Sequence, residues 1–144
     1  MHWLLRFDTK MKPCPGILFL LLLVSPVLEA SDKELLRKEA SLNAALNQTD
    51  MNLRAGEIAE YLDRKIVRLE ERIKKDLDKD ALALFDEASL KWRAYRDAQI
   101  NSEGDVYRGG SMRPLIQSLA FIRLTNDRLS TLQKMNPEGK YKAD

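Results

Sequence analysis

The sequence contains few of the side chains on which enzymes and metal sites usually depend. It has one cysteine, Cys14, and one histidine, His2, and both lie in the first 30 residues. The rest of the chain therefore has no thiolate nucleophile, no imidazole base and no cysteine or histidine ligand for zinc. Catalysis by carboxylates remains formally open, but Asp and Glu fall mostly on polar helix faces. We therefore expect no enzyme activity, no metal site and no cofactor.

Glycine-rich loops, strand patterns and net charge are also scarce. The Gly-Gly-Ser segment at 109–111 is too short for a phosphate-binding loop, and it follows a predicted helix and not a strand. No stretch alternates apolar and polar residues as a strand does. The formal net charge is only +2, which gives no electrostatic argument for binding nucleic acid or an anionic membrane. We expect neither kind of partner.

The longest apolar run is Ile17–Val24, which three basic residues precede and the small residue Ala30 follows. This order is typical of a secretory signal peptide. The run is much shorter than the about 20 residues that a membrane anchor needs. We predict that residues 1–30 are a signal peptide, whether translation begins at Met1 or Met11. The mature chain, residues 31–144, would be periplasmic or secreted, with a formal charge of +1 and no disulfide.

The mature chain begins with a pattern that predicts a first helix over residues 32–47. Ser31 and Glu34 have the spacing of a capping box, which satisfies free backbone amides at a helix start. Leucines recur on one face of this segment. A polar stretch then interrupts the pattern, and Thr49 or Asp50 is expected to cap the next helix.

The second predicted helix has the clearest periodic signal in the sequence. Its apolar residues recur at steps of three and four: Ile58, Leu62, Ile66, Leu69, Ile73 and Leu77. Glu70 and Glu71 stand four residues before Lys74 and Lys75, the favourable order for ion pairs on a helix surface. We expect these pairs to form a solvated face.

Two more helices are predicted, one on each side of a loop over Asn101–Ser111. Asp78 or Asp80 is expected to cap the third helix, and Ser111 to cap the fourth, with Pro114 in its first turn. The inward residues should be Phe85, Ala88, Trp92 and Tyr95 on the third helix, and Leu115, Leu119, Ile122, Leu129 and Leu132 on the fourth. The predicted fold class is all-α, a small antiparallel bundle of about four helices.

An aromatic and charged cluster closes the third predicted helix: Trp92, Tyr95, Arg96 and Asp97. The two aromatic residues are most simply core residues. Arg96 lies one turn from Trp92 and can stack on its ring. Asp97 is expected near the helix C-terminus, where the helix dipole disfavours a carboxylate. We therefore predict that it accepts hydrogen bonds from backbone amides within Gly109–Met112, with Arg96 or Arg128 as an ionic partner.

Three motifs in order resemble the DUF1311 family: Trp-x-x-Tyr-Arg-Asp-Ala at 92–98, Gly-Gly-Ser at 109–111 and Leu-Thr-x-x-Arg-x-x-x-Leu at 124–132. Thr49-Asp50-Met51-Asn52 resembles a further segment of that family. Its members are small, exported, helical and mostly bacterial, and the lysozyme inhibitor LprI gives them their implied activity. The motif residues, with a structural or a binding role, are Trp92, Tyr95, Arg96, Asp97, Gly109, Gly110, Ser111, Thr125 and Arg128.

The chain also departs from the family. Arg54, Ile100 and Ala120 stand near positions where members usually carry cysteine, so the disulfides that would fix the loop are missing. The resemblance implies a binding protein that inhibits lysozyme-type cell-wall hydrolases. The candidate binding surface is the loop 99–111, with Asp105, Tyr107 and Arg108, because loops on a rigid scaffold commonly bind partners. The alternative is an envelope assembly or stress protein that docks through the polar faces of the second helix.

Overall fold

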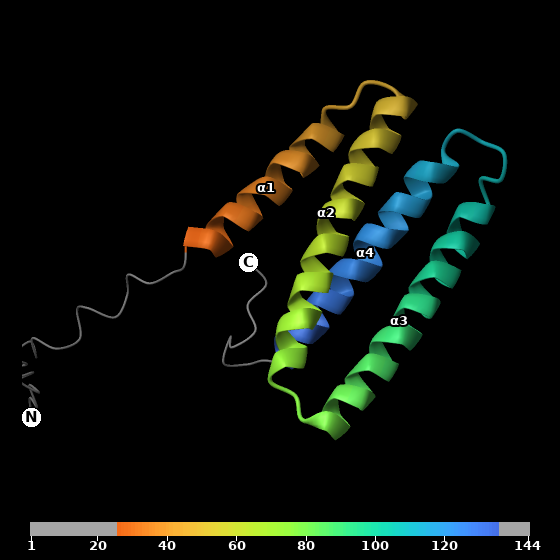
Figure 1. Cartoon of the computed structure of the whole chain (residues 1–144). Coiled ribbons are helices and arrows are strands. Elements are labelled where there is room, and N and C mark those ends of the chain that lie inside the picture. The colour runs from red at the N-terminus through yellow and green to blue at the C-terminus, as the bar shows by residue number, and fades with distance from the viewer. Residues whose placement is uncertain (1–25, 136–144) are drawn as a thin grey trace, which may run out of the picture.

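The fold consists of four helices joined by short connections. The computed structural model describes residues 26–135, with side chains from Lys33 onward. The helices are α1 (Pro26–Asn43), α2 (Gln48–Lys75), α3 (Lys79–Asp105) and α4 (Arg113–Lys134). All regular structure within these residues is helical, which confirms the predicted all-α bundle (Figure 1). The apolar run of the predicted leader lies outside the described residues.

Consecutive helices run antiparallel, and α4 lies between α2 and α3 (Figure 1). It packs against both α2 and α3, while α1 packs against α2 on the other side. The α1–α2 and α3–α4 connections therefore lie at one end of the bundle, and the α2–α3 turn lies at the other (Figure 1). We refer to these as the loop end and the turn end.

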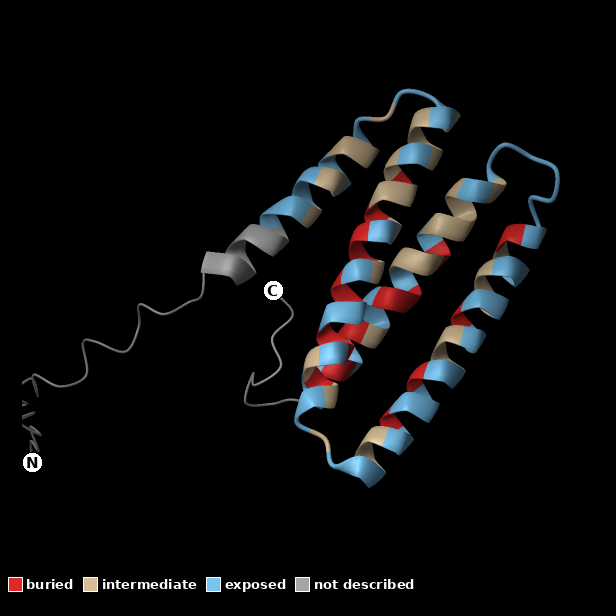
Figure 2. Ribbon diagram, viewed as in Figure 1, coloured by how far each residue is buried: buried red, intermediate tan, exposed pale blue. Residues whose placement is uncertain are grey.

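The hydrophobic core is centred on the face of α2 that the sequence predicts (Figure 2). Ile58, Leu62, Ile66, Leu69 and Ile73 are all buried, and Leu77 is partly buried against them. Phe85 of α3 and Leu129 and Leu132 of α4 complete the cluster. From α1, Leu35 and Leu42 pack on its edge. The periodic stripe thus identifies α2 as the helix that contributes most of the buried apolar side chains. Burial of apolar surface is the main source of stability.

The starts of α1 and α2 differ from the prediction. Helix α1 begins at Pro26, so Ser31 lies inside a helix and the predicted capping box does not start it. The N-cap of α2 is Asn47, and neither Thr49 nor Asp50. Its side-chain oxygen accepts a hydrogen bond of 2.9 Å from the backbone amide of Asp50. Asparagine is as good an N-cap as aspartate, so the cap falls at the first suitable residue of the polar stretch.

The start of α3 agrees with the prediction and its end does not. Asp78 caps the helix by accepting hydrogen bonds from the amides of Asp80 and Ala81. The helix then continues to Asp105, so the loop is shorter than predicted. Gly104 lies inside the helix and is buried, and a Cβ atom there would meet Gln117 of α4 at 2.6 Å. This glycine allows the two helices to approach closely and does not break α3.

The chain turns between α3 and α4 at Gly109, whose φ of 77° favours glycine. Helix α4 has Met112 as its N-cap residue, without a side-chain cap, so the prediction that Ser111 caps it is wrong. Pro114 occupies the first turn of α4, as predicted. Proline is tolerated there because its missing amide has no partner in the helix.

The inward face of α3 is rotated from the predicted one. Ala88 is exposed and Tyr95 is 56% exposed, whereas Ser89 and Arg96 are buried. On α4, Leu119 is 42% exposed, whereas Leu129 and Leu132 are buried as predicted, together with Ala120, Leu124 and the polar Thr125. A search for apolar periodicity misses the inward face of α3 because polar side chains occupy several of its positions.

Leu132→Ala should destabilise the fold by about 2–5 kcal/mol, because Leu132 is fully buried and the truncation leaves a cavity. The control is Leu46→Ala, at a side chain that is 92% exposed, where a change within about 0.5 kcal/mol is expected. Urea unfolding followed by circular dichroism measures both. Equal effects of the two variants would contradict the packing described.

Candidate functional site

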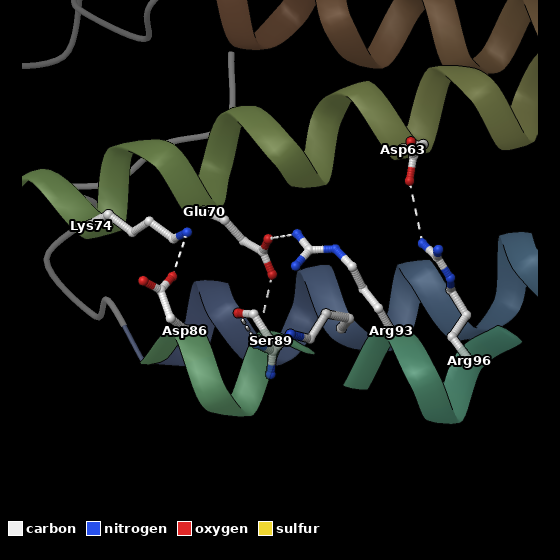
Figure 3. Close-up of polar contacts among 8 residues, drawn as sticks. Asp63, Glu70, Lys74, Asp86, Ser89, Arg93 and Arg96 are labelled. Atoms are coloured by element: carbon white, nitrogen blue, oxygen red, sulfur yellow. Dashed lines mark hydrogen bonds and ion pairs between the residues drawn. The ribbon is translucent and has the colours of Figure 1, made fainter. Parts of the chain in front are cut away.

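Ion pairs connect α2 with α3 along one side of the bundle (Figure 3). Asp63 pairs with Arg96 at 3.3 Å, Glu70 pairs with Arg93, and Lys74 pairs with Asp86 at 2.5 Å. The partners follow one another in opposite directions along the two helices. They therefore fix an antiparallel register between α2 and α3.

Glu70 is the most buried charge in this set, with only 2% of its surface exposed. Besides Arg93, the guanidinium of Arg128 on α4 lies 3.7 Å from its carboxylate. Arg128 also donates a hydrogen bond of 3.1 Å to the hydroxyl of Ser89, which is buried on α3. A buried carboxylate is costly without a partner. Burial of Glu70 is therefore favourable only when α3 and α4 pack so that Arg93 and Arg128 lie beside it.

The buried role of Glu70 differs from the prediction. Its spacing from Lys74 is typical of an ion pair on a solvated helix face. The structure shows that Lys74 pairs with Asp86 of α3, so the expected solvated pairing is wrong for Glu70. The available signal was its position on the helix. Glu70 stands four residues after Ile66 and three before Ile73, which places it on the same face as the buried stripe.

Trp92 lies between two arginines. The guanidinium carbons of Arg96 and Arg128 stand 5.1 Å and 5.6 Å from its ring centroid. Arg96 also lies 4.5 Å from the ring centroid of Phe121 on α4. The predicted stacking of Arg96 on Trp92 is therefore confirmed, and it forms part of a larger cation–π group. This group holds α3 against α4.

The prediction for Asp97 is wrong in its main part. Because α3 continues roughly two turns beyond it, the carboxylate does not sit at the C-terminal end of the dipole. Its side chain is 60% exposed and accepts a hydrogen bond of 2.9 Å from Arg96. Among the described residues, it makes no hydrogen bond to the amides of Gly109–Met112. The ionic partnership with Arg96 is the part that the structure confirms.

Two other motif segments meet at the loop end. The side-chain amide of Asn52, from the Thr-Asp-Met-Asn segment, donates a 3.0 Å hydrogen bond to the backbone carbonyl of Ser111. Thr125 on α4 is fully buried, and its hydroxyl has no hydrogen-bond partner among the described residues. Tyr95, in contrast, points outward, with 56% of its surface exposed. The motifs thus mainly hold helices and loop in place.

Of the predicted binding loop 99–111, residues 99–104 lie inside α3, whereas residues 105–111 are exposed and include the three candidate residues. Asp105 accepts two hydrogen bonds from Arg108, of 2.8 Å and 2.7 Å, while the Arg108 side chain is 74% exposed. Val106 is 81% exposed and Tyr107 is 38% exposed. Gly110, at the end of the turn, is also exposed. An apolar and a charged surface are therefore presented side by side at the loop end.

A polar group beneath the loop ties the end of α3 to α4. The carboxylate of Glu103 accepts hydrogen bonds from Gln99 at 2.9 Å and from Arg123 at 2.6 Å. These bonds, chiefly the one from Gln99 and then the charge of Arg123, lower the pKa of Glu103. Glu103 is therefore ionised at neutral pH and retains both bonds there.

Neither a metal centre nor a membrane span is found between residues 26 and 135. No group of three or more potential metal-ligating side chains occurs among those described. No described helix has the length and apolar composition to cross a bilayer. In the described part of the chain, the features that stand out are the exposed loop and the polar network.

Glu70→Gln should destabilise the protein by about 3–5 kcal/mol, since it removes the charge that two arginines share in the interior. The matched control is Glu60→Gln, because Glu60 is 77% exposed and pairs with Arg64 at 3.8 Å. The control should cost less than about 1 kcal/mol. Denaturant unfolding measures both variants, and a Glu70 variant as stable as its control would refute the structural role of the network.

Comparison with known proteins identifies a family. A search of curated proteins and a search of solved structures each found no match. The family model described as "Lysozyme inhibitor LprI" matches residues 27–132, which include all four motif segments and the whole network around Glu70. The match begins at the second residue of α1 and ends near the end of α4, so it covers nearly the entire bundle. The chain belongs to the lysozyme inhibitor LprI family.

Proposed function

We propose that the protein is an exported inhibitor of a lysozyme-type cell-wall hydrolase, and that it binds the enzyme through its loop end. Family membership supports the activity class. The observation that carries the choice of surface is the exposed segment 105–108, which combines Val106, Tyr107 and the ion pair of Asp105 with Arg108. Exposed apolar and aromatic side chains with an arginine are common at the centres of protein interfaces.

The chemistry of the target explains how this loop would inhibit. Most glycoside hydrolases cleave their substrate with a pair of carboxylates that flank the scissile bond in a cleft. A guanidinium matches a carboxylate in charge and geometry. Arg108 inserted into such a cleft would pair with these carboxylates, while Tyr107 and Val106 would occupy space that the sugar chain needs. The enzyme would be blocked without any reaction in the inhibitor.

The rigidity of the loop end supports this mechanism. The Asn52–Ser111 hydrogen bond ties the loop to α2, and Glu103 ties the end of α3 to Arg123 of α4. Arg108 is itself held by Asp105. Because these contacts exist before the partner binds, less conformational freedom is lost on binding.

The export part of the proposal predicts a processed protein. Intact-mass measurement of the exported product should give a chain that begins at Ser31 or within a few residues of it. This follows from the short apolar run and the small residue at the predicted cleavage point. A membrane-bound product that still contains Ile17–Val24 would contradict it.

Inhibition can be tested with purified protein and a suspension of bacterial cell walls cleared by lysozyme. The protein should slow clearing, and Tyr107→Ala or Arg108→Ala should raise the concentration needed by about tenfold or more, as expected for central interface residues. The matched control is Arg64→Ala, at a side chain that is 55% exposed on α2. It should leave inhibition unchanged, and circular dichroism should show that all variants remain folded.

The same experiment separates this proposal from the alternative of a docking protein. The side of α2 that stays exposed carries Glu60, Arg64, Val67, Arg68, Glu71 and Lys75. Absence of inhibition at tens of micromolar, across several lysozyme types, would reject the inhibitor. If Arg64→Ala abolished inhibition and the loop variants did not, the binding surface would lie on α2.

A further inference from the structure

An apolar pocket lies at the turn end of the bundle, opposite the proposed inhibitory loop. Its volume is about 400 Å³, within the usual range of about 300–1,000 Å³ for small-molecule sites. It is lined by residues of α2, α3 and α4, of the α2–α3 turn and of the position after α4: Ile73, Leu77, Ala81, Leu84, Phe85, Ala88, Arg128, Leu132 and Met135. Arg128 is the single charged residue among them. The pocket therefore combines an extended apolar wall with one cation.

Arg128 lines the pocket although most of its side chain is buried. Its side chain is only 12% exposed. It makes one hydrogen bond among the described residues, to Ser89, and its buried Nε atom has no partner. A guanidinium has five N–H donors. Most of its hydrogen-bonding capacity is therefore unused by the described side chains around it.

The charge of Arg128 has no hydrogen-bonded carboxylate among the described residues. Arg128 forms an ion pair of 3.7 Å with Glu70, whose carboxylate accepts its hydrogen bond from Arg93. The neighbouring cations have their own partners, Lys74 in Asp86 and Arg96 in Asp63 and Asp97. An anion whose oxygens accept the unused N–H donors of Arg128 would therefore complement this guanidinium.

We propose that the turn-end pocket binds a medium-chain fatty acid, with its carboxylate on Arg128 and its aliphatic chain on the apolar wall. Along α4, Arg128 lies one turn closer to the middle of the bundle than Leu132, and Met135 follows at the end. The carboxylate would therefore sit at the inner end of the pocket and the chain would extend towards Met135. A carboxylate offers two acceptor oxygens, and a guanidinium can bind it with two parallel hydrogen bonds.

Isothermal titration calorimetry on the full chain tests the proposal with dodecanoate and, for comparison, dodecyltrimethylammonium, which has the same chain and the opposite charge. Dodecanoate should bind about tenfold more tightly or better. Arg128→Met should remove this preference. Because that variant also disturbs the Glu70 network, Arg93→Met is its control, since Arg93 contacts Glu70 without lining the pocket.

A second pair of variants avoids the network altogether. Leu84 and Leu90 are both leucines of α3 with 69% exposure, and only Leu84 lines the pocket. Leu84→Asp should weaken dodecanoate binding about tenfold or more by placing a negative charge in the pocket wall, while Leu90→Asp should not. Absence of dodecanoate binding, equal binding of the cationic ligand, or equal effects of the two leucine variants would overturn the proposal. Lysozyme inhibition is measured separately, so either proposal can fail alone.

Discussion

A carboxylate that cannot face water determines how three of the helices meet. Glu70 lies on the buried side of α2, and leaving it unpaired there would cost several kcal/mol. Arg93 brings α3 to it and Arg128 brings α4. Apolar burial alone is not directional and would allow the helices to slide or rotate against one another. The shared carboxylate restricts them to the arrangement in which both arginines reach it, and Trp92 then fills the space between Arg128 and Arg96.

How much of this follows from the sequence depends on what each helix buries. Helix α2 buries an apolar stripe at regular steps, so its existence, core face and approximate extent are predictable. Helix α3 buries Ser89, Arg96 and Gly104 along with Phe85, and apolar periodicity therefore rotates its predicted face and ends it too early. Polar residues can be buried where they find a hydrogen-bond partner distant in the sequence, as Ser89 does in Arg128. Such pairings are invisible to a pattern confined to one helix. The spacing of Glu70 from Ile66 and Ile73 indicates that it lies on the buried face, but its partners Arg93 and Arg128 cannot be predicted from its own segment.

The loop end is held together without a disulfide, because the sequence has no cysteine after Cys14. Ala120 is a buried core residue, and Arg54 pairs with Glu57 on the same helix. Hydrogen bonds from Asn52 to the loop and from Gln99 and Arg123 to Glu103 hold this end together instead. A disulfide stabilises mainly by restricting the unfolded chain, whereas these bonds act only in the folded state. The loop therefore stays ordered only as long as α3 and α4 remain packed, which makes its shape dependent on the network around Glu70.

The buried residues that hold the helices together differ from the exposed loop residues that would bind a target. Of the motif residues, Trp92, Arg96, Thr125 and Arg128 lie in the interior or between helices, where a rigid partner protein cannot reach most of their surface. The other motif residues, Tyr95, Asp97 and Gly109–Ser111, are exposed. The exposed loop residues between the motifs have no packing role that would restrict their identity. Binding specificity can therefore change by substitution in the loop while the motifs keep the scaffold constant. Arg128 is the exception, because it belongs to the scaffold and also lines the turn-end pocket, where we propose that it binds a small anionic ligand.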